Sequence, residues 1–311
     1  MSNIAEPSSE AFSNKFAIYF AATRPPFILA TIIPILLGVA YSHYMGFEFK
    51  GLAFILALLA GAFLHAGINV LNDYYDALNG TDDANQDRIY PFTGGGRFIQ
   101  NEVLSTLQTR NYGLALLAVV TLIGLYLVLE TGLALLFLGA FGMLIGWAYS
   151  APPLMLNSRG LGELTVLIGF ALLPFGAWLT QTGNISSNAI LIAVPLGLLT
   201  SNLPFINQFP DRTADISANK MHWVVRLPIH VSRWGYVFMA DLAWFLILLY
   251  IVMGLLPTLS LISLLPIVAS MIATKELFQF SDQPRKLEKA IKLTLVTMLL
   301  HGVLLSLSLL F

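Results

Sequence analysis

The sequence predicts an all-α membrane protein: a bundle of nine transmembrane helices around a central cavity, with cytoplasmic cap loops after the second and sixth helices. Two observations lead to this fold class. The 311 residues are 57% hydrophobic and only 11% charged, whereas soluble chains carry about 25% charged residues. The apolar residues also form runs near the ~20 residues that cross a bilayer as a helix, too long and continuous for strands of a membrane barrel.

Nine apolar runs follow one another along the chain. The first, residues 17–43, comes after a polar tail at 1–16. This tail lacks the basic region and cleavage site of a signal peptide, so we expect the first span to stay in the mature protein. The other expected spans are residues 51–75, 110–129, 133–150, 162–181, 188–206, 233–253, 257–274 and 290–311. Residues 17–311 are expected to form a single transmembrane domain.

The basic residues lie almost entirely on one side of this topology. Of the 16 Lys and Arg residues, 15 fall in the N-terminal region or near the loops after spans two, four, six and eight, and only Lys50 falls on the other side. Because basic segments remain in the cytoplasm, we expect the N-terminus inside and the C-terminus outside. This arrangement requires an odd number of spans, which supports nine, and it predicts an integral inner or plasma membrane protein.

The two longest polar loops, residues 77–109 and 207–232, are both expected on the cytoplasmic side, whereas the opposite loops are short turns. The function is therefore expected at the cytoplasmic face. The chain has no cysteine, which excludes disulfides, thiolate metal sites and a cysteine nucleophile. Its net charge of −1 does not indicate nucleic-acid binding. No obligatory protein partner is indicated, and the lipid bilayer is the expected surrounding.

An acidic cluster, "NDYYDALNGTDD", ends the second span. Asn72 and Asp76 are four residues apart, so they share one face of a helix. Asp82 follows Gly80, a residue suited to a helix C-cap and a turn. We call Asn72, Asp76 and Asp82 the first motif. Acids at membrane depth are costly and are usually functional.

A second cluster, "NQFPDRTAD", follows the sixth span with related spacing. Asn207, Asp211 and Asp215 are four residues apart and share one helical face. We call these three residues the second motif. Pro210 is expected to disturb the helix just before Asp211. Carboxylates that converge repel one another unless a cation lies between them, and an all-oxygen set without Cys or His suits a hard cation such as Mg²⁺.

Other residues in the same loops could complete a site that binds a diphosphate. Cations there would neutralise its charge. They are Arg88, Arg97, Arg212, Lys220 and Arg226. The glycine-rich stretch "PFTGGGRF" at 91–98 matches no Walker pattern, and both a flexible turn and a substrate-facing lid remain open for it.

These motifs resemble those of the UbiA superfamily of intramembrane prenyltransferases. "NDYYDALNGTD" resembles the first Asp-rich motif of the family, and "NQFPDRTADISANK" resembles the second with its downstream lysine, Lys220. "TRPPFI" and "YSAPPLMLNSRGLGE" are weaker matches to the Arg-Pro signature of span one and to the loop after span four. The resemblance covers essentially the whole chain and is greatest to the 1,4-dihydroxy-2-naphthoate polyprenyltransferases of menaquinone synthesis.

The resemblance implies an enzyme that uses two Mg²⁺ ions to transfer a polyprenyl group from its diphosphate to an aromatic acceptor. The implied metal ligands are Asn72, Asp76, Asp82, Asn207, Asp211 and Asp215. The implied catalytic residues are Asp76, Asp211, Tyr149 and Lys220. The implied substrate-binding residues are Arg24, Asn72, Arg88, Arg97, Ser150, Arg159, Asn207 and Lys220. Tyr149 would stabilise an allylic cation through its ring, and the prenyl tail would lie in an apolar tunnel open to lipid.

Several alternatives remain open from the sequence. The acceptor could instead be 4-hydroxybenzoate, homogentisate or a lipid. An ion-coupled transporter is a second class of function, although transporters more often place acids in the middle of spans. Asp73 could belong to the first or the second ligand layer, and His65 could contact the acceptor or be a buried structural residue. Glu163 is expected to be an acid that favours the start of a helix.

Overall fold

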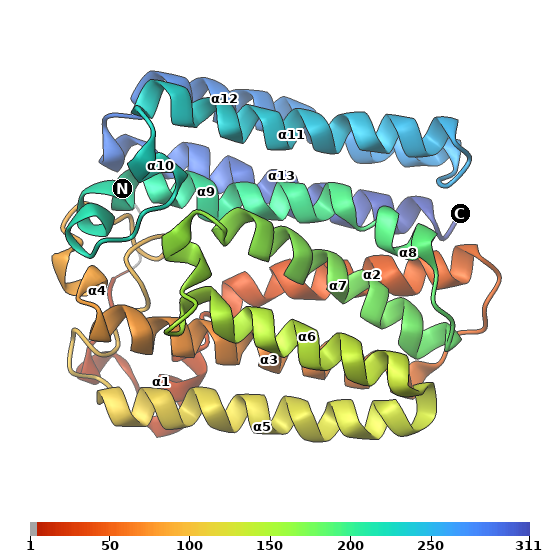
Figure 1. The fold of residues 1–311 in the computed structure, drawn as a ribbon, viewed down its shortest axis with the longest axis horizontal. Helices are drawn as coiled ribbons and strands as arrows, with labels where there is room; N and C mark the ends of the chain where they lie inside the picture. Colours follow the sequence, from red (N-terminus) through yellow and green to blue (C-terminus); the bar gives the residue numbers. More distant parts are fainter. Residues whose placement is uncertain (1–4) are drawn as a thin grey trace.

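The computed structural model describes residues 5–311 as a bundle of long, roughly antiparallel helices, and this part of the chain contains no strand (Figure 1). The elements are η1 (Ser9–Ala11), α1 (Lys15–Ala22), α2 (Pro25–Tyr44), α3 (Gly51–Leu78), α4 (Thr81–Ala84), α5 (Thr106–Thr131), α6 (Leu133–Ser150), η2 (Leu156–Arg159), α7 (Gly162–Thr182), α8 (Ser187–Leu191), α9 (Val194–Ser217), α10 (Trp223–Arg226), α11 (Ile229–Val252), η3 (Thr258–Leu264), α12 (Ile267–Phe280), η4 (Pro284–Lys286) and α13 (Glu288–Ser308).

Within residues 5–311, nine helical segments are long and apolar enough to cross a membrane. They are α2, α3, α5, α6, α7, α11 and α13, together with the continuous segments Ser187–Ser217 and Thr258–Phe280. This confirms the predicted all-α bundle of nine transmembrane helices. Many apolar side chains face outward on these helices, for example Leu129 and Val252. Outward apolar surface is what a bilayer requires of a helical bundle.

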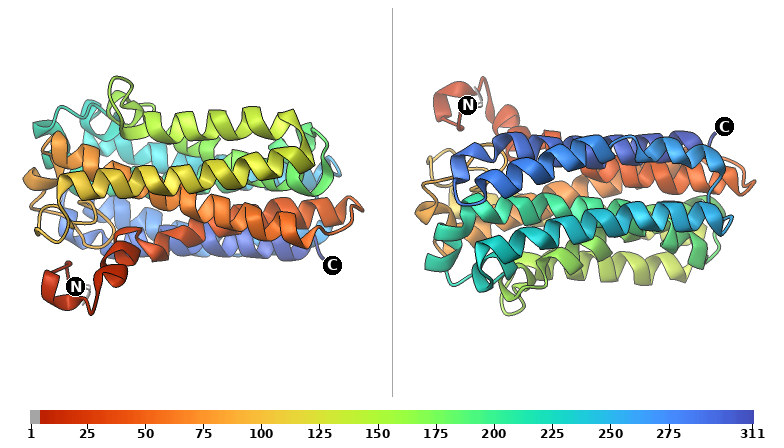
Figure 2. Two further views of the ribbon diagram at one scale, coloured as in Figure 1. Left: turned by 90° about the horizontal axis from the view of Figure 1, so that it is seen from below. Right: turned by 90° about the horizontal axis from the view of Figure 1, so that it is seen from above.

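The first span differs from the prediction. The expected span at 17–43 is divided at Arg24, whose φ of 55° lies in the left-handed region and ends the short helix α1. The residue before a proline is disfavoured in the α conformation, and Pro25 then begins α2. The rings of Phe16 and Phe20 stack on the exposed side of α1, which lies outside the bundle at one end (Figure 2). The first transmembrane helix is therefore α2 alone.

The sixth span is longer than predicted. Residues 207–217 belong to α9 and not to a loop, so the second motif lies entirely on one helix. Pro210, which was expected to disturb the helix, lies inside it, and the helix continues to Ser217. α9 is the most enclosed span, and membrane helices tolerate proline where neighbouring helices pack around it. The corresponding connection is residues 218–228, which include α10. The other predicted cap, 77–109, is the connection 79–105, which includes α4.

Both of these long connections lie at the same end of the bundle as the N-terminal residues, and the C-terminus lies at the opposite end (Figure 1). A hydrophobic core formed by α2, α7, α9, α11 and α13 holds the helices together. Close approaches within it depend on glycine: a Cβ at Gly38 of α2 would collide with the backbone of Pro174 in α7. This packing brings the ends of α3 and α9, and thus both motifs, to one end of the molecule.

Candidate active site

A cavity of about 590 Å³ lies among α2, α3, α5, α6, α7 and α9. One end is polar, and both motifs line it together with Lys220. The remainder is largely apolar and continues between α5, α6 and α7 as far as the helix turn at their opposite ends, where Val128 and Leu135 line it. The predicted central cavity is therefore present, and it joins an acidic compartment to a long apolar arm.

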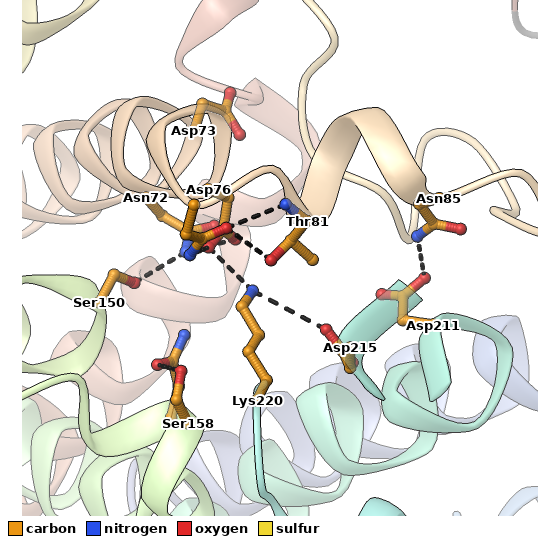
Figure 3. Close-up of polar contacts among 12 residues, drawn as sticks. Asn72, Asp73, Asp76, Thr81, Asn85, Ser150, Ser158, Asp211, Asp215 and Lys220 are labelled. Atoms are coloured by element: carbon orange, nitrogen blue, oxygen red, sulfur yellow. Dashed lines mark hydrogen bonds and ion pairs between the residues drawn. The ribbon is translucent and has the colours of Figure 1, made fainter. Parts of the chain in front are cut away.

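The first motif is arranged around Asp76, which lies at the end of α3. Asn72 donates from Nδ2 to Asp76 Oδ2 at 3.2 Å and to Ser150 Oγ at 2.7 Å (Figure 3). Asn79 donates to the other oxygen, Asp76 Oδ1, at 3.2 Å. These amides fix the carboxylate of Asp76 and orient it toward the centre of the site.

The second motif faces the first from α9. Asn207 donates from Nδ2 to the carbonyl of Phe92 at 3.0 Å, and its Oδ1 has no hydrogen-bond partner among residues 5–311. Asp211 Oδ1 accepts from Asn85 Nδ2 at 2.6 Å (Figure 3). Asp215 Oδ2 lies 2.9 Å from His222 Nε2. Each member of the second motif is therefore held by a residue from one of the two long connections.

Lys220 connects the two motifs. Its Nζ lies 2.8 Å from Asp76 Oδ1 and 3.9 Å from Asp215 Oδ1 (Figure 3). Burial disfavours the charged ammonium, but the two carboxylates outweigh burial and raise the pKa of Lys220 above its ordinary value. A buried, charged lysine thus lies between an acid of α3 and an acid of α9.

Asp82 reaches the cavity from α4, beyond the end of α3. It is almost fully buried, and its Oδ2 has no hydrogen-bond partner among residues 5–311. Burial, together with the charges of Asp76 and Asp73, raises the pKa of Asp82 well above its ordinary value. A cation bound beside Asp82 would favour the ionised carboxylate and so oppose this shift.

The glycine-rich loop closes over these acids. Thr93, Gly94 and Gly95 line the cavity. Gly95 has a φ of 76°, and a Cβ there would collide with the carboxylate of Asp82. Because only glycine combines this conformation with such a close approach, the loop is a fitted wall of the cavity. This observation favours the substrate-facing reading of the loop.

Asp73 has a structural role in the wall of the site. It pairs with Arg24 and accepts from the backbone N–H of Gly96 at 3.0 Å. Arg24 lines the cavity, and its buried Nε has no hydrogen-bond partner among residues 5–311. Burial lowers the pKa of Arg24, but Asp73 and Asp82 outweigh burial and raise it. Asp73 therefore fixes a permanent cation at the edge of the cavity.

Three of the arginines and the serine predicted to bind substrate do not line the cavity. Arg88 pairs with Glu6 and donates to the carbonyl of Asn85. Arg97 donates to the carbonyl of Asp82. Arg159 is exposed and donates to the carbonyl of Pro153 at 2.6 Å. Ser150 contacts the site through Asn72.

Tyr149 and Gln208 also line the cavity. Tyr149 is the last residue but one of α6. Glu163 does begin α7, as expected for a helix-start acid, and it also accepts from Gln208 of α9 at 2.5 Å. That contact places Gln208 in the cavity wall beside the second motif.

Sequence reasoning missed Asn85 and His222. Both are buried, and each fixes one carboxylate of the second motif. Neither has a spacing that relates it to a motif. The only signal for these two residues in the sequence was that they lie in the two loops predicted to cap the site.

The donor set suits a hard cation, although the carboxylates do not form a compact cage. Within residues 5–311 no three acidic or histidine side chains gather closely enough to hold a metal by themselves. Two buried oxygens, Asp82 Oδ2 and Asn207 Oδ1, have no hydrogen-bond partner there and belong to opposite motifs. Since Mg²⁺ takes only one or two carboxylates and completes its shell with water and phosphate oxygens, the residues fit such an ion.

The apolar arm has one polar wall. His65 and Thr31 line it, with His65 Nδ1 2.6 Å from Thr31 Oγ1, and Asn69 lines it closer to the motifs. Opposite them, α5 and α6 contribute Gly124 and Gly139, at which an added Cβ would meet no atom. Open space therefore surrounds these glycines in the wall of the arm.

A comparison with protein-family models gives a match to the UbiA prenyltransferase family over residues 31–299. This chain belongs to that family. It is therefore a prenyltransferase and an integral membrane protein, which confirms the resemblance seen in the two motifs. The matched range contains every member of both motifs and, apart from the first six residues of α2, the helices that line the cavity.

Curated relatives and solved structures agree with this family. The chain is 28% identical over 314 residues to 1,4-dihydroxy-2-naphthoate octaprenyltransferase of Haemophilus influenzae, which covers 97% of this chain and 99% of that protein. It is 28% identical to 2-carboxy-1,4-naphthoquinone phytyltransferase of Synechocystis sp., over 71% and 69% of the two chains. Among solved structures, a UbiA homologue from Archaeoglobus fulgidus bound to DMAPP and Mg²⁺ has a TM-score of 0.65 at 17% identity, covering 93% of this chain and 99% of that one.

Proposed function

We propose that this prenyltransferase transfers a polyprenyl group from its diphosphate to 1,4-dihydroxy-2-naphthoate, the aromatic acceptor of menaquinone biosynthesis. One observation carries the proposal: two acidic motifs face each other at the polar end of a cavity whose other end is a long apolar arm. A polyprenyl diphosphate has the same division between a charged head and an apolar tail. The naphthoate acceptor is supported by the names of the relatives in Haemophilus influenzae and Synechocystis.

Two Mg²⁺ ions are proposed to bind between the motifs, as supported by the archaeal homologue that holds Mg²⁺ with a prenyl diphosphate. When bound, they supply positive charge that stabilises the departing diphosphate. The proposed ligands are the six residues predicted from the sequence: Asn72, Asp76, Asp82, Asn207, Asp211 and Asp215. The unpartnered oxygens of Asp82 and Asn207 are the observation that supports this set.

Lys220 is proposed to bind the diphosphate directly. Its ammonium lies between the motifs, where it offsets the charge of Asp76 and Asp215. With cations bound to the carboxylates, the ammonium is free to donate hydrogen bonds to diphosphate oxygens. The diphosphate leaves with the electron pair of the broken carbon–oxygen bond, and Lys220 stabilises the charge that develops on it.

The acceptor is proposed to lie along the wall formed by α2 and α3. Arg24 lines this wall with an unpartnered Nε, which suits the carboxylate of a naphthoate. His65 lies farther along the same wall. Because Thr31 engages its Nδ1, its Nε2 is the nitrogen left to meet a ring hydroxyl.

The bond-forming step follows from this placement. The allylic carbon left by the diphosphate is positive, and the ring of Tyr149 stabilises it from the cavity wall. A carbon of the acceptor ring supplies the electron pair for the new carbon–carbon bond. The group on that carbon then leaves without its bonding electrons, as a proton or, where the carbon carries the carboxylate, as CO₂. The apolar arm keeps water away from the cation.

The cavity's polar end is proposed to face the cytoplasm. The loops and helix ends on that side carry 15 of the 16 basic residues, and only Lys50 lies at the other end. This distribution supports a cytoplasmic N-terminus and an external C-terminus.

The test is to incubate the purified protein and Mg²⁺ with farnesyl or a longer polyprenyl diphosphate and three acceptors: 1,4-dihydroxy-2-naphthoate, 4-hydroxybenzoate and homogentisate. Product analysis by mass spectrometry should show the prenylated naphthoquinol as the main product. EDTA should abolish its formation, and added Mg²⁺ should restore it. Preferential prenylation of another acceptor would refute the naphthoate assignment and leave the prenyltransferase assignment intact.

An Arg24 variant separates acceptor binding from donor binding. Arg24→Gln should raise the KM for the naphthoate by about 10- to 100-fold, since a charged hydrogen bond is worth about 1.5–3 kcal/mol. The KM for the prenyl diphosphate should change much less. Arg110→Gln, an exposed change at the same end of the bundle, serves as the control. Equal effects on the two substrates would contradict the acceptor role.

A further inference from the structure

The residues before α1 contact the loop that carries Asp82 and Asn85. Glu6 accepts a hydrogen bond from Arg88 Nε at 2.7 Å and another from Asn101 Nδ2 at 3.3 Å. Arg97 Nε lies 3.8 Å from the second oxygen of Glu6. Asn101 also donates to the carbonyl of Pro7 at 2.9 Å. This N-terminal contact spans more than 80 positions of sequence and involves three residues of one connection.

The two arginines held by Glu6 in turn hold the backbone of the site. Arg88 Nη1 donates to the carbonyl of Asn85 at 2.6 Å, and Asn85 fixes Asp211 of the second motif. Arg97 donates to the carbonyl of Asp82 of the first motif. Glu6 is therefore linked to the first motif through Arg97, which contacts Asp82. It is linked to the second motif through Arg88, which contacts Asn85.

The charge balance of this cluster depends on Glu6. Burial favours its neutral form, but hydrogen bonds from Arg88 and Asn101 outweigh burial and lower the pKa of Glu6 below its ordinary value. The carboxylate is thus ionised at neutral pH. Arg97 is nearly buried, with 9% of its side chain exposed, so loss of the Glu6 charge would leave two neighbouring arginines without their shared anion.

These contacts also account for an unexpected feature of the site. Arg88 and Arg97 were predicted to bind substrate; in the structure they do not line the cavity, and both contact Glu6. Guanidinium groups bind carboxylates and carbonyls in a fixed planar geometry, which suits them to hold a loop in place. Their position makes them supports of the loop, with the N-terminal segment as their common anchor.

We propose that Glu6 is a positioning residue: by fastening Arg88 and Arg97, it sets the positions of Asp82 and Asn85 and hence the binding of Mg²⁺ and diphosphate. This inference rests on the proposed cation and diphosphate site. It predicts that loss of the Glu6 charge weakens binding of both ligands and has little effect on the rate at saturation, because Glu6 touches no reacting atom.

The experiment compares Glu6→Gln with Glu6→Asp and with Glu10→Gln. Glu10 is an exposed residue of η1, so its variant makes the same chemical change four residues away in the same N-terminal region. Transfer rates are measured against Mg²⁺ and against farnesyl diphosphate. Glu6→Gln should raise the Mg²⁺ requirement and the KM for farnesyl diphosphate by about 3- to 10-fold, the loss expected for one charged hydrogen bond acting indirectly. The value of kcat should stay within about 2-fold, Glu6→Asp should restore most of the affinity, and Glu10→Gln should match the wild type.

A second variant guards against loss of folding. Asn101→Ala removes the amide that ties Glu6 and Pro7 to the loop and should shift both constants in the same direction by a smaller factor. Mg²⁺-dependent binding of farnesyl diphosphate, measured by calorimetry without acceptor, separates this inference from the proposed function. Weakened binding in Glu6→Gln supports the inference whichever acceptor is prenylated. Wild-type constants in both Glu6→Gln and Asn101→Ala, or a fall in kcat alone, would overturn it.

Discussion

The first motif reaches the cavity from two separate helices, with Asp76 on α3 and Asp82 on α4, whereas the second motif lies on α9 alone. The second motif nevertheless depends on the first half of the chain. Asn85, just after α4, holds Asp211, and Lys220, just after α9, pairs with Asp76. Each half thus supplies the polar partner of an acid in the other half. The two motifs therefore form one site only when both connections, residues 79–105 and 218–228, are folded over it.

The largest effect is expected from removing the central acid of either motif. Asp76→Ala and Asp211→Ala should each reduce prenyl transfer by at least about 100-fold, because each removes a proposed cation ligand and leaves a buried amide without its acceptor. Steady-state rates at saturating Mg²⁺ provide the measurement. Asp282→Ala, an exposed acid at the same end of the bundle, should retain normal activity. A large loss in only one of the two variants would show that the motifs do not share the reaction equally.

Lys220→Met tests the connection between the motifs. It leaves Asp76 and Asp215 facing each other without a cation, which should destabilise the metal-free protein by about 3–5 kcal/mol and slow transfer by about 100-fold. Mg²⁺ should raise the melting temperature of this variant more than that of the wild type, since it replaces the missing charge. Lys50→Met at the opposite end is the control. An equal response to Mg²⁺ in Lys220→Met and wild type would argue against a cation site between the motifs.

Variants of the neighbouring acids Asp82 and Asp83 test which residue of α4 belongs to the first motif. Asp82 is buried in the cavity wall, whereas Asp83 is exposed. Asp82→Asn should weaken Mg²⁺-dependent transfer by about 10- to 100-fold, because the uncharged amide is a poor ligand for a hard cation. Asp83→Asn makes the same change one residue away and should have little effect. Equal losses in the two variants would falsify the assignment of Asp82.

The smallest effects are expected from the residues that hold the second motif. Asn85→Ala and His222→Ala should each raise the Mg²⁺ requirement by about 10-fold, the usual effect of removing a group that orients a metal ligand. The two losses should multiply in the double variant, because the residues hold different carboxylates, Asp211 and Asp215. Gln86→Ala, an exposed change beside Asn85, is the control. A double variant no worse than either single one would mean that the two supports act on a single group.

Much of the fold could be predicted because a bilayer imposes its requirements on composition directly. Apolar runs of spanning length predicted nine helices, and the distribution of Lys and Arg placed the two longest loops at one end. Helical spacing then placed Asn72 with Asp76 and Asn207 with Asp211. These features were readable because they depend on local periodicity, which does not require knowledge of how the helices pack.

The boundaries that failed depended on tertiary contacts. The break at Arg24 follows from its pairing with Asp73 as well as from the proline after it, and continuation of α9 through Pro210 follows from the helices packed around it. A sequence window does not contain these distant partners. The apolar content of 17–43 was therefore mistaken for one continuous helix, and the polar content of 207–217 for a loop.

The sequence by itself determined the chemical groups of this protein: two sets of carboxylates and amides at the ends of membrane spans, with a lysine close behind the second. Only the tertiary structure decided which of the nearby cations line the cavity. Lys220 lies between the motifs and Arg24 lines the cavity, whereas Arg88 and Arg97 turn toward Glu6 and support the loop. The reason is physical: a charged side chain pairs with the nearest buried opposite charge in space, and that distance is set by packing and not by separation along the chain.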